Sequence, residues 1–288
     1  MRRSHYLVCF TVIILGAALF IGTSRSHAIT YGFVDSNGTY GNTGAFIVKS
    51  PSTGQIFPIC SGTLITSDVF LTAGHCTAFF TQELAPQGFT AYVSFDGSIP
   101  FGALTSNKTK LESVAAVVTN PNFNQRQSDP GDIGALILAS NVGAITPATL
   151  PACGLLDQLA AQNGLKTAVF TPVGYGVQNR VVGGGVPFFQ DRNPIPRMFA
   201  FSSFNALNRG YLRLSQNPST GNGGTCFGDS GGPNFLTVNG QQIIAAITIT
   251  GDTVCRSTNV DYRLDTSSAQ AFFAYVNAVF GTDIPIVC

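Results

Sequence analysis

Short apolar runs recur along the chain and alternate with turn residues. In the first half they lie at residues 45–48, 59–65, 69–73, 89–95, 114–118 and 133–138, and in the second half at residues 167–173, 198–204, 211–214, 242–250 and 261–264. Runs of this length, rich in Val, Ile, Phe and Thr and bounded by Gly, Pro, Asn and Ser, predict β-strands. Many short strands with frequent turns are typical of barrels, so the pattern favours an all-β protein.

Two segments interrupt this strand pattern. Residues 141–162 contain two prolines and are predicted to connect a first barrel, about residues 29–145, to a second barrel unit, about residues 163–288. Residues 181–196 contain three consecutive glycines and three prolines, which indicates a long exposed loop. The chain therefore divides into two strand-rich halves with no internal sequence repeat.

The last segment differs from the others by its helical spacing. Its apolar residues stand at positions 272, 273, 276, 279 and 280. Thr266 or Ser267 can cap the helix at its start, and Gly281 can end it. We therefore expect a C-terminal helix.

Residues 1–28 have the pattern of an export signal. Arginines at positions 2 and 3 precede an almost wholly apolar stretch at residues 7–21, and residues 26–28 (SHA) resemble a cleavage site. The mature chain would then start at Ile29. The apolar stretch is shorter than the roughly 20 residues of a membrane span, so we expect no membrane association after signal removal, with an uncleaved anchor as the alternative.

Composition narrows the possible partners and cofactors. Only 10% of the 288 residues are charged and the net charge is +1, so nothing indicates binding to nucleic acid or to an anionic membrane. Of seven cysteines, Cys9 would leave with the signal, and the remaining six suit disulfides in an oxidising compartment. Six cysteines allow 15 pairings. Zinc is the competing interpretation, but the chain has no C-x-x-C spacing, so we predict no metal.

Two short segments carry the candidate chemistry. Residues 226–233 read CFGDSGGP, with Ser230 among glycines, and residues 72–76 read TAGHC, with His75 next to a cysteine. A serine hydroxyl attacks carbonyl groups only when an imidazole takes its proton and backbone N–H groups hold the resulting oxyanion. The other two histidines of the chain lie in the signal, so His75 is the only possible imidazole base of the mature protein.

These segments resemble the signatures of the chymotrypsin-like (trypsin-type) serine proteases. The family has Gly-Asp-Ser-Gly-Gly-Pro and Thr-Ala-Ala-His-Cys, and here Gly74 replaces the second alanine. The resemblance implies two six-stranded antiparallel β-barrels followed by a C-terminal helix. It also implies a catalytic triad of His75, Asp132 and Ser230, since Asp132 opens a segment similar to the family's Asp-Ile-Ala-Leu. Asp129 is the rival acid, although its place before Pro-Gly suits a turn cap.

The resemblance assigns further roles around the nucleophile. The N–H groups of Gly228 and Ser230 would form the oxyanion hole. Asp229 would pair with the ammonium group of a newly formed N-terminal isoleucine. No Arg/Lys-Ile-Val-Gly-Gly segment occurs, but Ile29 directly follows the signal, so export itself could expose the activating terminus.

The specificity pocket of the family maps less closely onto this chain. Gly224 stands where an acid would select Arg or Lys, Gly251 corresponds to a wall glycine, and Val260 to a position near the base that is commonly glycine. We therefore expect small to medium uncharged apolar side chains on the acyl side of the cut bond. The alignment can slip by one here, because the hydroxyl of Thr248 suits the residue that steadies the catalytic aspartate better than Ile249 does.

The family also suggests how the cysteines pair and what the protein does. It implies the disulfides Cys60–Cys76 and Cys226–Cys255, which leaves Cys153 and Cys288 to each other. The sequence thus predicts a secreted (extracellular or periplasmic) serine endopeptidase that acts on proteins or peptides as a monomer and needs no cofactor. The alternatives are a catalytically impaired binding protein on a protease scaffold and a secreted esterase.

Overall fold

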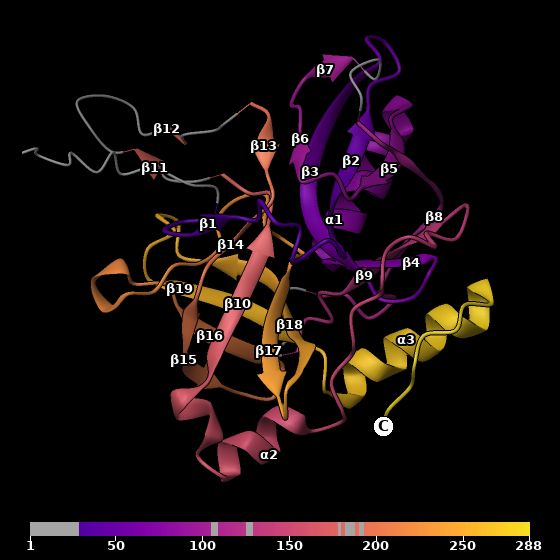
Figure 1. Cartoon of the computed structure of the whole chain (residues 1–288). Helices are drawn as coiled ribbons and strands as arrows, with labels where there is room; N and C mark the ends of the chain where they lie inside the picture. Colours follow the sequence, from indigo (N-terminus) through magenta and orange to yellow (C-terminus); the bar gives the residue numbers. More distant parts are fainter. Residues whose placement is uncertain (1–28, 105–108, 125–128, 178–179, 182–187, 190–192) are drawn as a thin grey trace, which may run out of the picture.

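The fold consists of two β-barrels side by side, with a helix at the C-terminus (Figure 1). The computed structural model describes residues 29–104, 109–124, 129–177, 180–181, 188–189 and 193–288. The predicted signal, residues 1–28, lies outside the described residues. The predicted double-barrel fold is confirmed.

Six antiparallel strands form the first barrel, in the order β2-β5-β8-β9-β4-β3. Pairing of β2 with β3 closes it. The strands are β2 (Thr43–Lys49), β3 (Gln55–Leu64), β4 (Val69–Thr72), β5 (Thr90–Ser94), β8 (Glu112–Thr119) and β9 (Gly134–Leu138), with β7 (Ala103–Leu104) added on the edge of β3. Each of the six predicted runs of the first half lies on one of these barrel strands.

The second barrel has the strand order β10-β15-β16-β19-β18-β17 and is closed by pairing of β10 with β17. Its strands are β10 (Val169–Gly174), β15 (Ser202–Leu207), β16 (Tyr211–Ser215), β17 (Pro233–Val238), β18 (Gln241–Gly251) and β19 (Thr258–Arg263). Sequence analysis missed β17, because this strand follows the glycine-rich segment without a turn signal and its apolar run is interrupted at Asn234 and Thr237.

Short strands connect or extend the barrels. β1 (Phe33–Val34) pairs with β14 (Met198–Phe199), and β6 (Ser98–Ile99) pairs with β13 (Ile195–Pro196). Strands β11 (Arg180–Val181) and β12 (Phe188–Phe189) pair with each other. Much of the loop predicted at residues 181–196 lies outside the described residues.

Three α-helices lie around the barrels. They are α1 (Gly74–Phe79), followed by a π turn (Phe80–Leu84) and a 3-10 turn (Ala85–Gln87); α2 (Leu155–Ala161), followed by a 3-10 turn (Gly164–Thr167); and α3 (Ser267–Phe280), with one more 3-10 turn at Pro218–Thr220. The Thr266 side chain caps α3 by accepting the N–H of Ala269, and Gly281 ends it with φ +68°. The predicted C-terminal helix is therefore present, whereas sequence analysis did not predict α1 and α2.

The largest cluster of buried apolar residues joins both barrels and the last helix. Phe46 and Phe70 of the first barrel, Ile247 of the second and Phe273 of α3 are fully buried in one contiguous cluster. In Figure 1, α3 accordingly lies alongside the lower edge of the first barrel. Because close-packed interiors do not deform continuously, this shared core fixes the cleft between the barrels.

The N-terminal segment lies on the second barrel. Ile29 is fully buried beside Met198 and Ala200. The N–H of Thr30 donates to the carbonyl of Gly224 (2.8 Å), and the N–H of Gly224 donates back to Thr30 (3.0 Å). Burial of an apolar side chain and these two hydrogen bonds hold residues that sequence analysis had grouped with the first barrel.

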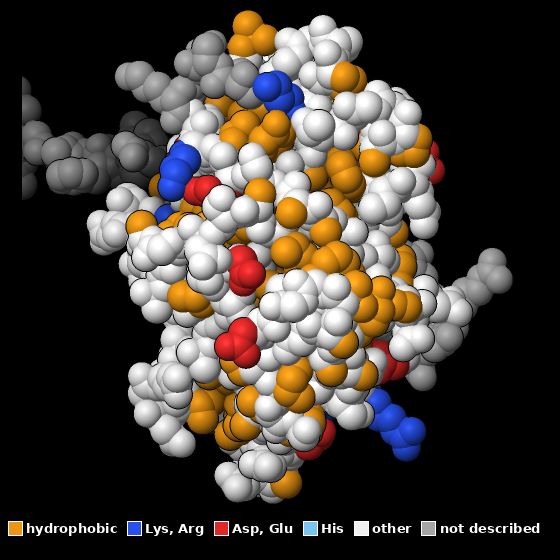
Figure 2. Space-filling model, turned by 90° about the vertical axis from the view of Figure 1, so that its right-hand side faces the viewer, with side chains coloured by type: hydrophobic (Ala, Val, Ile, Leu, Met, Phe, Trp, Pro, Cys, Tyr) orange, Lys and Arg blue, Asp and Glu red, His pale blue; other side chains and the backbone are white. Residues whose placement is uncertain are grey.

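Three disulfides join the pairs that the family resemblance implied, namely Cys60–Cys76, Cys153–Cys288 and Cys226–Cys255. Disulfides of this number are typical of proteins in oxidising compartments. On the face in Figure 2, charged side chains are few and scattered among apolar and uncharged ones. A helix long and apolar enough to cross a membrane is absent from the described part of the chain.

Candidate active site

His75 and Asp132 meet at the start of α1. The imidazole Nδ1 of His75 lies 3.0 Å from Oδ2 and 3.2 Å from Oδ1 of Asp132. The backbone N–H of His75 also donates to Oδ1 (2.8 Å). One carboxylate thus contacts both the backbone and the ring of the same residue, and with a side chain only 7% exposed it fixes the imidazole orientation.

Steric contacts explain why residue 74 is a glycine. A Cβ atom there would lie 3.0 Å from both the backbone nitrogen and the backbone oxygen of Ile133. Real Cβ atoms rarely approach backbone atoms that closely. Glycine therefore allows the turn that carries His75 to lie directly against the segment that carries Asp132.

The rival acid Asp129 caps the turn in which it lies. Its carboxylate accepts the backbone N–H of Gly131 at 3.2 Å, which is the turn-capping role that its sequence context suggested. Among the described residues, only Asp132 makes an ion pair or hydrogen bond to the His75 ring.

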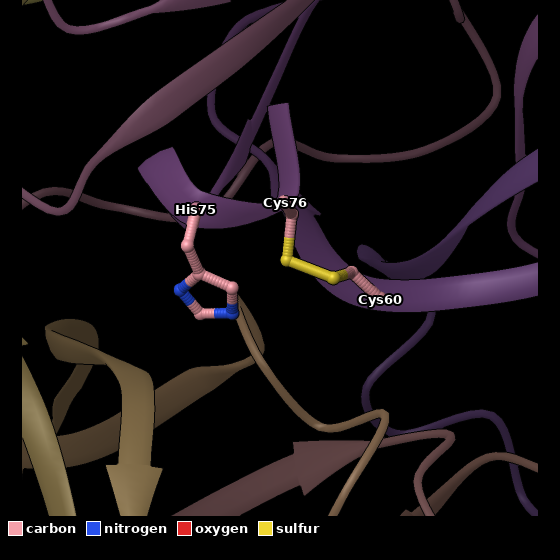
Figure 3. Close-up of side chains that lie close together, drawn as sticks. All are labelled: Cys60, His75 and Cys76. Atoms are coloured by element: carbon pink, nitrogen blue, oxygen red, sulfur yellow. A yellow bond between two sulfur atoms is a disulfide. The ribbon is translucent and has the colours of Figure 1, made fainter. Parts of the chain in front are cut away.

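Cys60, His75 and Cys76 lie together as a possible metal-binding group. Figure 3 shows that the two sulfur atoms are bonded to each other and that the imidazole projects from the same stretch of ribbon. Sulfur atoms in a disulfide are not the thiolates that bind zinc. The cluster therefore serves to tie the His75 turn to β3.

The backbone of Gly228 has an unusual conformation directly before the nucleophile segment. Its φ is +95°, which favours glycine. The carbonyl of Phe227 accepts the N–H of Val177 at 2.7 Å. Because C=O and N–H point in opposite directions across a trans peptide, the N–H of Gly228 points away from Val177.

The N–H of Ser230 is directed in the same manner. The carbonyl of Asp229 accepts the N–H of Gly232 (2.9 Å), which turns the N–H of Ser230 the other way. Within the described part of the chain, the N–H groups of Gly228 and Ser230 have no acceptor. Two unpaired donors that flank the serine can bind a developing oxyanion.

Ser61 of β3 holds this loop against the first barrel, and sequence analysis gave no sign of it. Its N–H donates to the carbonyl of Ser230 (2.9 Å), and its hydroxyl donates to the carbonyl of Gly228 (3.0 Å). The same hydroxyl accepts the N–H of Tyr175 at 2.9 Å. The nucleophile loop is therefore anchored across the barrel interface by one buried side chain.

Ser230 and His75 line one pocket of about 290 Å³ between the barrels. Its other lining residues are Thr225, Cys226, Phe227, Thr248, Ile249, Thr250, Gly251, Asp252, Thr253 and Cys255. The hydroxyl of Ser230 and the ring of His75 are not hydrogen-bonded to each other in this structure. Such bonds are often long without substrate and tighten when the complex forms.

A family comparison agrees with this geometry. The family model for Trypsin matches residues 34–273, which is most of the chain. The chain belongs to the trypsin family of serine peptidases. The matched residues include both barrels, nearly all of the strands and the first turns of α3.

The trypsin-family pocket differs here from the pocket predicted from sequence. Gly251 lies in its wall, but Val260 lines a neighbouring pocket instead. Val260 pairs with Thr250 and Arg213 on adjacent strands, while Asn259 and Asp261 on either side of it are fully buried. Because successive residues of a strand point to opposite faces, Val260 cannot limit the depth of the Ser230 pocket.

A buried chain of polar groups leads inward from this pocket. The Thr225 hydroxyl donates to Asn259 (2.6 Å), the Asn259 amide donates to Asn234 (3.1 Å), and the Asn234 amide donates to Asp261 (2.8 Å). The Asn234 amide also donates to the Thr248 hydroxyl (3.0 Å). Among the described residues, the hydrogen bonds of the Asp132 carboxylate go to His75, so the slipped alignment is not supported. Burial raises the pKa of Asp261 well above its usual range.

Gly224 lies beside the buried Gln216. A Cβ atom at Gly224 would come within 2.2 Å of the Gln216 side-chain oxygen, so the site excludes any larger residue. The same glycine forms the bridge to Thr30. Gly224 thus links the N-terminal segment to the pocket region and carries no side chain into it.

Asp229 is fully buried directly before the serine. Its two carboxylate oxygens accept the N–H groups of Gly176 (2.8 Å) and Cys226 (2.9 Å). Burial raises the pKa of Asp229 to about 7, although these two bonds act to lower it. Among the described residues, no cation pairs with this carboxyl.

Proposed function

We propose that this chain is an exported serine endopeptidase that uses His75, Asp132 and Ser230 as its catalytic triad. The observation that carries the proposal is the convergence of three features on one pocket. These are the serine, the imidazole backed by a carboxylate at 3.0 Å, and two N–H groups beside the serine that have no acceptor among the described residues. Acyl transfer requires this combination.

In the proposed mechanism, Ser230 Oγ attacks the carbonyl carbon of the substrate while His75 Nε2 takes the hydroxyl proton. The N–H groups of Gly228 and Ser230 hold the oxyanion of the tetrahedral intermediate. The imidazolium, stabilised by Asp132, gives its proton to the leaving amine, and the C–N bond breaks to leave an acyl-enzyme. A water molecule then repeats the sequence and releases Ser230.

We also propose that export activates the enzyme. Ile29 is buried, and Thr30 is hydrogen-bonded to Gly224, five residues before Asp229. A free ammonium group at Ile29 would supply the cation that the carboxyl of Asp229 lacks. Signal removal alone would then complete the site, and N-terminal sequencing of the secreted active enzyme tests this.

The pocket beside Ser230 is proposed to receive the side chain on the acyl side of the cut bond. Gly224 adds no acid to this pocket, and the Thr225 and Thr248 side chains line it. The one acid in its lining, Asp252, already accepts the backbone N–H groups of Ser257 and Thr258. That the enzyme prefers substrates with uncharged side chains before the cut bond stays a prediction. We no longer expect Val260 to limit the size of these side chains, because it lines the neighbouring pocket.

Covalent labelling tests the proposed activity. A fluorophosphonate should label the purified mature protein at Ser230, and Ser230→Ala should lose both the label and peptide hydrolysis, by about 10⁶-fold in turnover. Circular dichroism of the variant should match the parent protein, because the exchange removes one hydroxyl. Peptide hydrolysis by Ser230→Ala within tenfold of the parent protein would refute the assignment.

A further inference from the structure

A second pocket lies beside His75, opposite the one that holds Ser230. Its volume is about 530 Å³. His75, Ile249 and Thr250 line both pockets. The second is completed by Pro130 and Asp132 from the first half of the chain and by Tyr211, Arg213 and Val260 from the second barrel. The two pockets therefore lie on either side of the same stretch of β18.

This stretch of β18 has one unpaired edge. Its pairing with β17 ends at Ile247, and the N–H of Thr248 bonds the carbonyl of Gly232. From Thr250 to Gly251 the strand pairs only with β19 on its other edge. An extended peptide can add to such an edge, and its side chains then alternate between the two sides.

Because the side chains of an extended peptide alternate between two sides, each substrate position can be assigned to one of the pockets. When the residue before the cut bond occupies the Ser230 pocket, the second and fourth residues before the bond point to the other side. Those side chains face the second pocket. The third residue before the bond points away from it.

The second pocket carries an unpaired positive charge. Arg213 is exposed and stands in register with Val260, which is in register with Thr250, so the three form a row across adjacent strands. No ion pair to the Arg213 guanidinium is found among the described residues. The nearby carboxylates are engaged, Asp132 with His75 and Asp129 with a backbone N–H.

We propose that Arg213 makes this enzyme prefer substrates with Asp or Glu two or four residues before the cut bond. The inference rests on the proposed peptidase function and adds a substrate class to it. Guanidinium groups bind carboxylates by charge and by paired hydrogen bonds. Because Arg213 is exposed to solvent, we expect one such contact to raise kcat/KM by about two- to fivefold.

Matched peptides provide the test. Peptides that differ only by Glu or Gln at the second, third or fourth position before the cut bond are compared with the mature enzyme. The Glu/Gln ratio of kcat/KM should exceed one at the second or fourth position and stay near one at the third. It should fall toward one in about 1 M salt, since screening weakens exposed charge pairs.

Charge-reversal variants complete the design. Arg213→Glu should reverse the ratio at the sensitive position, and Arg213→Gln, which changes shape less, should bring it to one. Lys166→Glu makes the same charge change on the exposed turn after α2, outside both pockets, and should keep the parent ratio. The inference is overturned if the Glu/Gln ratio of the parent enzyme is 1 at the second and fourth positions. It is also overturned if a ratio above 1 is unchanged in Arg213→Gln. In both cases the proposed peptidase function stands. Absence of both hydrolysis and fluorophosphonate labelling refutes the peptidase and the inference together.

Discussion

Asp229 should make the free energy of unfolding depend strongly on pH in a chain that does not begin at Ile29. Its pKa rises from 3.8 to about 7 because it is fully buried. Each pKa unit corresponds to about 1.4 kcal/mol, so ionising the unpaired carboxyl should cost the fold about 4 kcal/mol. The folded state binds the proton of Asp229 more tightly than the unfolded state. The stabilisation that this proton provides is therefore complete below about pH 4 and is lost as the pH rises from about 4 to 7.

The experiment compares two chains that differ by the presence or absence of Ala28 at the N-terminus. A chain beginning at Ile29 offers an ammonium group with a pKa near 8, whereas a chain that keeps Ala28 has only a peptide N–H there. We expect the longer chain to lose about 4 kcal/mol of unfolding free energy between pH 4 and 7. The chain that begins at Ile29 should lose much less, because its ammonium group compensates the carboxylate.

Urea unfolding at pH 4, 5.5 and 7 measures this difference. Both chains carry Ser230→Ala, so that they cannot digest themselves. Asp229→Asn in the longer chain is the control and should flatten the pH dependence, whatever its effect on absolute stability. Equal pH dependence in the two chains would refute the pairing of Ile29 with Asp229.

Two further pairs of substitutions each compare a buried carboxylate with a second carboxylate near it. Asp132→Asn should lower kcat by about 10⁴-fold through the wrong imidazole tautomer, while Asp129→Asn should change kcat little, and the reverse result would exchange their roles. Asp265→Asn should lower the free energy of unfolding by about 3 to 5 kcal/mol, since it leaves the buried Arg263 partly unpaired. Asp157→Asn removes the other partner, which is 68% exposed, and should cost under about 1 kcal/mol; urea unfolding that gives equal losses would contradict this account.

Local sequence predicted most of the barrel strands, the last helix and the reacting groups that we propose. Strand runs such as residues 69–73 are bounded by turn residues, and α3 is bounded by Thr266 and Gly281, so their signals lie within a few residues. His75 was predicted to be the base because no other histidine remains in the predicted mature chain. The disulfide pairs came from the family resemblance, and the structure has the same pairs.

The pocket around the serine could not be predicted in this way. Val260 was assigned to it by its position in the family pattern, but the pairing of β18 with β19 shifts between Thr248 and Thr250. One such shift decides which alternate residues of β19 point toward the pocket. Counting along one strand contains no information about the register of its neighbour.

Only the tertiary structure brings the site together. Ser61 and Ser230 are far apart in the sequence, yet their backbone groups are hydrogen-bonded across the two barrels. Arg213 gains a place beside His75 only because β16, β19 and β18 lie in that order. The sequence supplies residue types and local conformations, whereas the distances between them follow from barrel closure and from the core that both barrels share.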